Sequence, residues 1–149
     1  MDVLVDSNIL LRLVNAADPQ QPLVVAAADK LLLKGENLCI VPQNLYEFWS
    51  VATRSTTQNG LGLSIPEVQK AIARFRRYFS LRDEVPTIFS EWEKLVSHHG
   101  IVGKNVHDTR LVAAMVVHNI THLLTFNQQD FLRFSNITAL TPADVLAMP

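Results

Sequence analysis

Acidic side chains occur in four segments that lie far apart in this sequence, each at the end of an apolar run or on a helix-like segment. Asp6 directly follows the strand-like run 3–5, and Glu47 lies within the helix-like segment NLYEFWSVATR. Groups just past the carboxyl ends of parallel strands meet in one crevice, so such residues can converge despite their separation in sequence. The remaining members are Asp108, at the start of HDTRLVAAMVV, and Asn127 and Asp130, which follow the apolar run of LLTFNQQDF.

Carboxylates that face one another at close range need either protons or a cation. Two unit charges about 4 Å apart interact by roughly 4 kcal/mol at an effective dielectric constant near 20. Mg²⁺ prefers hard oxygen ligands and keeps several waters, which suits an open carboxylate site that acts on phosphates. In such sites the metal activates water and offsets the charge that develops on the phosphoryl oxygens. The acids therefore predict a metal-dependent phosphodiester hydrolase.

Apolar strand-like runs alternate with helix-like segments along the chain, a pattern that favours an α/β fold with parallel strands and crossover helices. A helix is predicted over residues 22–33, ended by Gly35. Ser64 and Glu67 have the spacing of a capping box at the start of another helix. Strands are predicted at residues 3–5, 38–41, 122–125 and 137–140, with a short fifth near Glu84 and Val85.

With these segments in view, the chain resembles the PIN-domain nucleases, most closely the VapC-type toxins of bacterial toxin–antitoxin pairs. The resemblance runs nearly from end to end and rests on VLVDSN, the Glu47 helix, GIVGKNVHDTRLVAA and LLTFNQQDF, in that order. It implies a three-layer α/β/α fold and Mg²⁺- or Mn²⁺-dependent endonucleolytic cleavage of single-stranded RNA. It also implies a cognate antitoxin and a homodimer. Apolar residues that could form the dimer interface as readily as the core are Leu23, Val24, Phe48 and Trp49.

The resemblance carries over to individual residues. Asp6, Glu47 and Asp108 fall on the acidic positions of the family. Asn8 and Thr125 fall on polar positions that, in the family, help to orient the acids. These five residues are therefore expected to form the centre of the site.

One position departs from the pattern of the family. An acid commonly stands two residues after the threonine, where this chain has Asn127, and the next carboxylate is Asp130. An asparagine oxygen can ligate a metal but brings no charge. The residues expected to be catalytic are Asp6, Glu47, Asp108 and Asp130, and the expected metal ligands are these four acids together with Asn127.

Each acid also has a purely structural interpretation. Asp6 could only cap the helix that begins near Ser7, and Asp108 could be a favourable charge in the first turn of its helix. Glu47 lies at the border of an apolar helical stripe and could form a salt bridge with Arg54. The order of all the acidic segments along the chain favours the metal site over these separate explanations.

Basic side chains in two regions could contact the phosphates of RNA. Lys70, Arg74 and Arg77 fall within about 60° of one another on a helix, opposite its apolar stripe. A solvated helix face is the favoured explanation of this pattern, and contact with phosphates is the alternative. Lys104 and Arg110 flank the acid that opens HDTRLVAAMVV and are expected to lie closer to the chemistry.

Length and composition agree with this hypothesis. The 149 residues, 48% of them hydrophobic, are enough for one well-buried core and few for two, so residues 1–149 are expected to form one domain. A net charge of −1 counts against a general nucleic-acid coat protein. The longest apolar stretch, 111–117, is far shorter than the roughly 20 residues that span a bilayer. The acidic start argues against a signal peptide, so we expect a cytoplasmic protein without a membrane partner. The only cysteine, Cys39, is expected to be a buried thiol.

Two other classes of function remain open. A haloacid-dehalogenase-like phosphatase also has an aspartate after its first strand, but it needs a second acid two residues later, where this chain has Asn8. A catalytically weakened PIN-like module would keep the fold and act by association. The neutral side chain of Asn127 is the feature that favours this second alternative.

Overall fold

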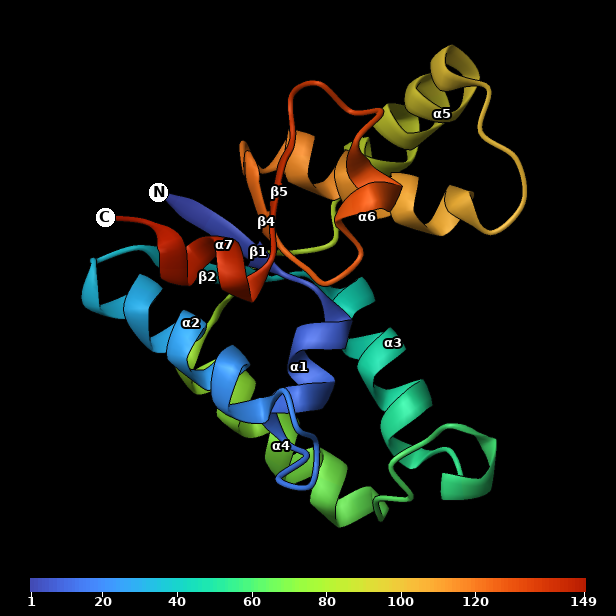
Figure 1. Cartoon of the computed structure of the whole chain (residues 1–149). Helices are drawn as coiled ribbons and strands as arrows, with labels where there is room; N and C mark the ends of the chain where they lie inside the picture. Colours follow the sequence, from blue (N-terminus) through green and yellow to red (C-terminus); the bar gives the residue numbers. More distant parts are fainter.

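A sheet of five parallel strands runs through the centre of the molecule in the order β3-β2-β1-β4-β5 (Figure 1). β1 is the middle strand and pairs with both β2 and β4. The computed structural model describes residues 1–149 and has the α/β fold with a central parallel sheet that the sequence predicts. The strands are β1 (Asp2–Val5), β2 (Asn37–Ile40), β3 (Ser80–Leu81), β4 (His122–Leu124) and β5 (Thr138–Leu140).

Helices cover both faces of the sheet and complete the three layers. Alternate residues of β1 enter different cores, because Val3 and Val5 pack on one face and Leu4 packs on the other. None of the helices has the length and apolar character that crossing a membrane requires. One face is covered by α1 (Ser7–Leu13), α2 (Gln21–Leu33), α3 (Pro42–Thr53), α4 (Ile65–Tyr78) and α7 (Pro142–Ala147), and the other by α5 (Thr87–His99) and α6 (Asn105–Val117).

Local sequence signals explain where these helices begin and end. The Ser64 hydroxyl accepts a hydrogen bond from the Glu67 backbone N–H, and the Glu67 carboxylate accepts one from the Ser64 N–H, both at 3.3 Å. This is the predicted capping box of α4. Gly35, just after α2, has φ +79°, a left-handed conformation that favours glycine and ends the helix as predicted.

Two of the four residues considered for a dimer interface belong to the core. Val24 of α2 and Phe48 of α3 are completely buried within the protomer. They therefore have the core role, which was one of the two roles open to them, and are unavailable to a second copy. Leu23 and Trp49 are only partly buried.

The short fifth strand lies earlier in the chain than predicted. β3 pairs with β2 through Ser80 and Leu81, at the edge of the sheet. Glu84 and Val85 belong instead to the connection that leads to α5. A strand of two residues is too short to show the alternation of apolar and polar residues by which strands are recognised.

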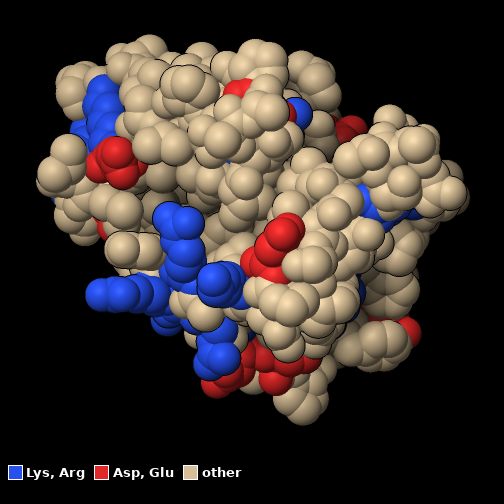
Figure 2. All heavy atoms as spheres, turned by 90° about the horizontal axis from the view of Figure 1, so that it is seen from below, with Lys and Arg blue, Asp and Glu red and all other residues tan.

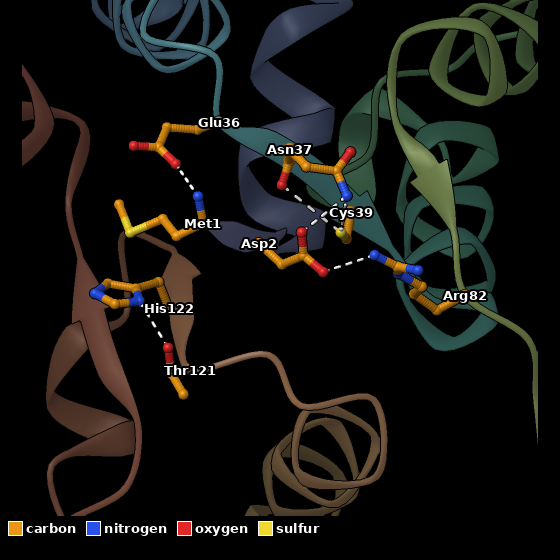
Figure 3. Close-up of polar contacts among 8 residues, drawn as sticks. All are labelled: Met1, Asp2, Glu36, Asn37, Cys39, Arg82, Thr121 and His122. Atoms are coloured by element: carbon orange, nitrogen blue, oxygen red, sulfur yellow. Dashed lines mark hydrogen bonds and ion pairs between the residues drawn. The ribbon is translucent and has the colours of Figure 1, made fainter.

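A group of polar side chains lies where β1 and β2 begin, at the end of the sheet opposite to their carboxyl ends (Figure 3). Asp2 accepts hydrogen bonds from Asn37 Nδ2 at 2.9 Å and from Arg82 Nη2 at 2.6 Å. Cys39 is completely buried, as predicted, and burial raises the pKa of its thiol. This group ties the strands together, and its acid is already neutralised by a cation.

Candidate metal centre

Four acids come together from segments that are distant in sequence, and we call them the acid cluster. Asp6 lies between β1 and α1, and Glu47 lies in the second turn of α3. Asp108 lies in the first turn of α6, and Asp130 lies in the short 3₁₀ helix Gln128–Phe131 that follows β4. The carboxyl ends of β1 and β4 therefore supply two members, and the neighbouring helices supply the other two.

Asp6 is the most buried acid of the cluster, with 6% of its surface exposed. Its Oδ1 accepts a hydrogen bond from the Ser7 N–H at 2.8 Å, so Asp6 does cap α1. Its Oδ2 accepts hydrogen bonds from Thr125 Oγ1 at 2.7 Å and from Asn8 Nδ2 at 3.3 Å. The capping interpretation is thus correct, and these hydrogen bonds hold the carboxylate in one position.

Thr125 and Asn8 form a hydrogen-bond network around Asp6. Thr125 Oγ1 accepts from Asn8 Nδ2 at 3.2 Å and from the Asn127 N–H at 3.0 Å. Asn8 Oδ1 accepts from the Phe126 N–H at 3.2 Å. This network joins the start of α1 to the end of β4, so the position of Asp6 depends on both segments.

Glu47 is held from two sides. Its Oε2 accepts a hydrogen bond from Ser7 Oγ at 2.9 Å, and its Oε1 accepts one from Gln43 Nε2 at 2.9 Å. Arg54 is exposed at the end of α3 and forms no ion pair with Glu47, so the salt-bridge alternative is wrong. The reason is distance, because seven residues of helix separate the two α-carbons by roughly 10 Å.

Gln43 connects Glu47 to α6. Its Nε2 also donates to the His107 carbonyl oxygen at 2.8 Å, and its Oε1 accepts from Arg110 Nη1 at 3.1 Å. Arg110, which the sequence predicts to contact RNA, is further paired with Glu84. Sequence reasoning did not select Ser7 or Gln43. For Gln43 a signal existed, because residues four apart share one helix face.

Burial and neighbouring carboxylates raise the pKa of two acids of the cluster. Burial, followed by the charges of Glu47 and Asp108, raises the pKa of Asp6 from 3.8 to about 6. Burial, followed by the charges of Asp130 and Glu47, raises the pKa of Asp108, while His107 and Lys104 lower it. No acid of the cluster forms an ion pair. The acids that do form ion pairs lie elsewhere and are Asp2, Asp18, Glu36 and Glu84.

The donor set suits a hard divalent cation. Only oxygen ligands are offered, and a cation would relieve the repulsion between the carboxylates. No three Asp, Glu, His or Cys side chains are arranged to hold an ion among themselves as they stand. Mg²⁺ commonly takes one or two carboxylates and keeps several waters, so direct ligation by three acids is not required. The residues present therefore fit Mg²⁺ or Mn²⁺.

The turn after Thr125 contributes a charge through Asp130 rather than through residue 127. Asn127 is exposed, and its hydrogen bonds come from its backbone alone: its N–H donates to Thr125 Oγ1 and its carbonyl oxygen accepts from the Asp130 N–H. Asp130 is also exposed, but its charge is the strongest of those that raise the pKa of Asp108. Asp130 is therefore the fourth negative charge of the cluster.

The basic residues occupy two separate places. Lys70, Arg74 and Arg77 are exposed on α4, opposite its buried stripe, as predicted. Figure 2 shows lysine and arginine side chains gathered on the lower face of the molecule, where α4 lies in Figure 1. Lys104 is exposed at the start of α6, next to the acid cluster.

The sequence matches the family model of the PIN domain over residues 3–137. The chain belongs to this family. The predicted resemblance is thus confirmed at the level of the family, and this PIN domain has the nuclease fold. No curated protein matches the chain in sequence.

Solved structures with the same fold include toxin–antitoxin complexes. VapBC2 from Rickettsia felis, bound to a DNA fragment from their promoter, is 18% identical with a TM-score of 0.66, over 95% of this PIN domain and 98% of that chain. VapBC-1 from nontypeable Haemophilus influenzae is 15% identical with a TM-score of 0.69, over 96% and 99%. VapC20 from Mycobacterium tuberculosis, a sarcin-ricin loop cleaving toxin, is 17% identical with a TM-score of 0.64, over 89% and 95%.

Proposed function

We propose that this PIN domain is a divalent-metal-dependent endoribonuclease that cleaves single-stranded RNA in the cytoplasm as the toxin of a toxin–antitoxin pair. One observation carries the proposal: acids from four distant segments lie close enough for their charges to act on Asp6 or Asp108, and none of the four is paired with a cation. Such an arrangement costs stability unless a metal relieves it. The nuclease fold of the family supports the same conclusion.

The residues of the cluster would divide the work. Asp6 and Asp108 would hold the metal. Burial and neighbouring acids raise their pKa values, so their deprotonated forms are the ones that a cation would stabilise most. When bound, the metal supplies activation of water and neutralisation of the scissile phosphate. Ser7 and Gln43 keep the Glu47 carboxylate in one orientation, from which it can accept a proton from the attacking water. Lys104 offers a positive charge to the phosphate.

The two alternative functions fare differently against these contacts. A haloacid-dehalogenase-like phosphatase would need an acid at residue 8, but the Asn8 amide is engaged by Asp6, Thr125 and the backbone beside it. The weakened binding module keeps one point in its favour, which is the neutral Asn127. It remains the second candidate.

Cleavage of a labelled single-stranded RNA tests the proposal directly. The purified protein should cleave this RNA in the presence of Mg²⁺ or Mn²⁺, and it should stop when the metal is chelated. A duplex of the same sequence should be cleaved far more slowly. Binding of the RNA without cleavage under either metal would overturn the nuclease and establish the weakened binding module.

We further propose that a cognate antitoxin binds this PIN domain and that the PIN domain forms a homodimer. The support for the antitoxin comes from similarity of fold, since VapBC2 and VapBC-1 are complexes of this kind. Several large apolar side chains are exposed and available to such partners. They include Leu33, Val102 and Leu132.

Asp130 and Asn127 allow a matched test of the fourth charge. Asp130→Asn removes a charge that acts on Asp108, so it should weaken Mn²⁺ binding by about tenfold in calorimetric titration. Asn127→Asp adds a charge to the same turn and should tighten Mn²⁺ binding. Both side chains are exposed, so neither change should disturb the fold. Equal Mn²⁺ affinity in both variants and the parent would remove this turn from the metal centre.

A further inference from the structure

A hollow lies beside the acid cluster and has no role in the proposed chemistry. It is open to solvent, has a volume of about 590 Å³ and lies between the start of α6, the first turns of α5 and the segment that leads into α5. Its walls combine flat rings with charged groups. The residues that matter for the argument are Glu84, Phe89, Trp92, Val106, His107 and Arg110.

Hydrogen bonds of Gln43 connect the hollow to the acid cluster. Arg110, in the hollow, donates to Gln43, and Gln43 in turn donates to the Glu47 carboxylate. Gln43 also donates to the His107 carbonyl oxygen, and the next residue is Asp108. Two hydrogen bonds therefore separate the hollow from an acid of the cluster. If the scissile phosphate of an RNA lies at the acid cluster, the base of the adjoining nucleotide is close enough to enter the hollow.

The ring surfaces in the hollow are open. Phe89 is 64% exposed, and its ring lies 5.8 Å from that of Trp92 at an angle of 34°. Trp92 is fixed in place because its Nε1–H donates to the Val106 carbonyl oxygen at 2.8 Å. An aromatic ring left in water on a helix is a surface on which an unpaired base can stack.

The charged groups add polar recognition to this surface. Glu84 and Arg110 form an ion pair at the rim, and each side chain remains more than a third exposed. The carboxylate can accept hydrogen bonds from base amines, and the guanidinium has further N–H groups to donate. Flat rings next to a donor and an acceptor match the edge and face of a nucleobase. A base within a duplex has no free face to offer.

We propose that this hollow binds one unpaired nucleobase of the RNA, adjoining the phosphate that faces the acid cluster, and thereby sets where the RNA is cut. The proposal rests on the proposed ribonuclease function. Phe89 supplies the stacking surface, and the Glu84–Arg110 pair contacts the edge of the base. The hollow thus selects unpaired RNA and gives the cleavage a sequence preference.

Phe89→Ala tests the proposal, with Tyr46→Ala as the matched control because Tyr46 is a similarly exposed ring outside the hollow. Binding of a short labelled single-stranded RNA is measured in the Asp108→Asn background, which prevents cleavage. Phe89→Ala should raise the Kd about tenfold, the loss expected for one stacked base. Tyr46→Ala should leave the Kd unchanged. In the cleaving enzyme, Phe89→Ala should raise KM more than it lowers kcat.

A double-mutant cycle between Phe89→Ala and an RNA that lacks one base tests whether the ring and the base contact each other. Removing the base at one position beside the cleavage site should weaken binding to the parent about tenfold and should add no further loss to Phe89→Ala. Additive losses, or no loss in Phe89→Ala, would overturn the proposal. So would conversion of a dimer to a monomer by Phe89→Ala, because the ring would then belong to an interface between copies.

The same measurements separate this inference from the proposed function. Trp49→Phe leaves Trp92 as the only tryptophan, and quenching of its fluorescence by RNA reports the hollow without any cleavage. Quenching that Phe89→Ala abolishes, in a protein that cleaves no RNA, would overturn the nuclease and support the base site. Cleavage with no quenching of Trp92 would overturn the base site alone.

Discussion

Asp108→Asn and Asp6→Asn are each expected to reduce cleavage of single-stranded RNA by roughly a thousandfold or more, while the protein stays folded. Each change removes a charged oxygen ligand that would contribute several kcal/mol to metal-assisted hydrolysis. Asparagine keeps the shape of the side chain, and at residue 6 it can still cap α1. The measurement is single-turnover cleavage at saturating Mg²⁺, with folding checked by circular dichroism.

The metal-free variants should be at least as stable as the parent, which distinguishes this result from general damage. Each substitution removes a carboxylate whose charged form is disfavoured by burial and by neighbouring acids, which raise the pKa values of Asp6 and Asp108. Asp29→Asn is the matched control, because Asp29 is an exposed acid of α2 outside the cluster. Full activity in both cluster variants, once contaminating nuclease is excluded, would refute the assignment of the site.

The metal-free protein is expected to lose about 3 kcal/mol of stability between about pH 4 and pH 7. The pKa of Asp6 rises from 3.8 to about 6 on folding, so the folded state holds this proton more tightly than the unfolded state does. Stability is therefore fully present below the unfolded pKa and is lost as pH rises through the folded one. The raised pKa of Asp108 acts in the same direction. Urea unfolding in the presence of a chelator measures the effect.

Mg²⁺ should reverse this loss at neutral pH, because it binds the deprotonated acids. A metal concentration a hundredfold above its Kd contributes about 3 kcal/mol. Asp6→Asn provides the control and should flatten the pH dependence. Asp144 has the opposite effect on stability, because hydrogen bonds from Thr141 lower its pKa on folding. The pH range over which Asp144 changes the stability lies below pH 3.8, outside the range of this experiment. Stability that rises from pH 4 to pH 7 without metal would contradict the predicted repulsion.

The centre of the sheet and most of the cluster could be predicted because their signals are local. Buried parallel strands are continuous apolar runs, and an acid directly after such a run, like Asp6, has one geometric meaning in an α/β fold. Asp130 was predicted for the same reason, as it closely follows β4. The capping box at Ser64 and Glu67 involves only four residues.

Contacts between distant segments could not be predicted from the sequence. Arg110 looked like a free cation, but its partners Glu84 and Gln43 lie 26 and 67 residues away. For Glu47 the only partner that the sequence suggested was Arg54, on its own helix, as an alternative to the metal site, whereas Ser7 holds it from 40 residues away. The edge strand β3 was not predicted at its observed position for a different reason. Its two residues are too few to show the alternation of apolar and polar side chains that marks a strand. Hydrogen bonds across the fold depend on register, which the order of residues does not reveal.

The hydrogen bond from Thr125 Oγ1 to Asp6 spans 119 residues, and this span has a consequence for the making of the protein. A ribosome delivers Asp6 first, but Thr125, at the end of the strand that fixes it, follows 119 residues later. Pairing of β1 with β4 is a long-range event that closes late. An incomplete chain that stops before Thr125 lacks the complete site. The proposed nuclease activity therefore cannot appear in a nascent chain before β4 and the turn that follows it have been made.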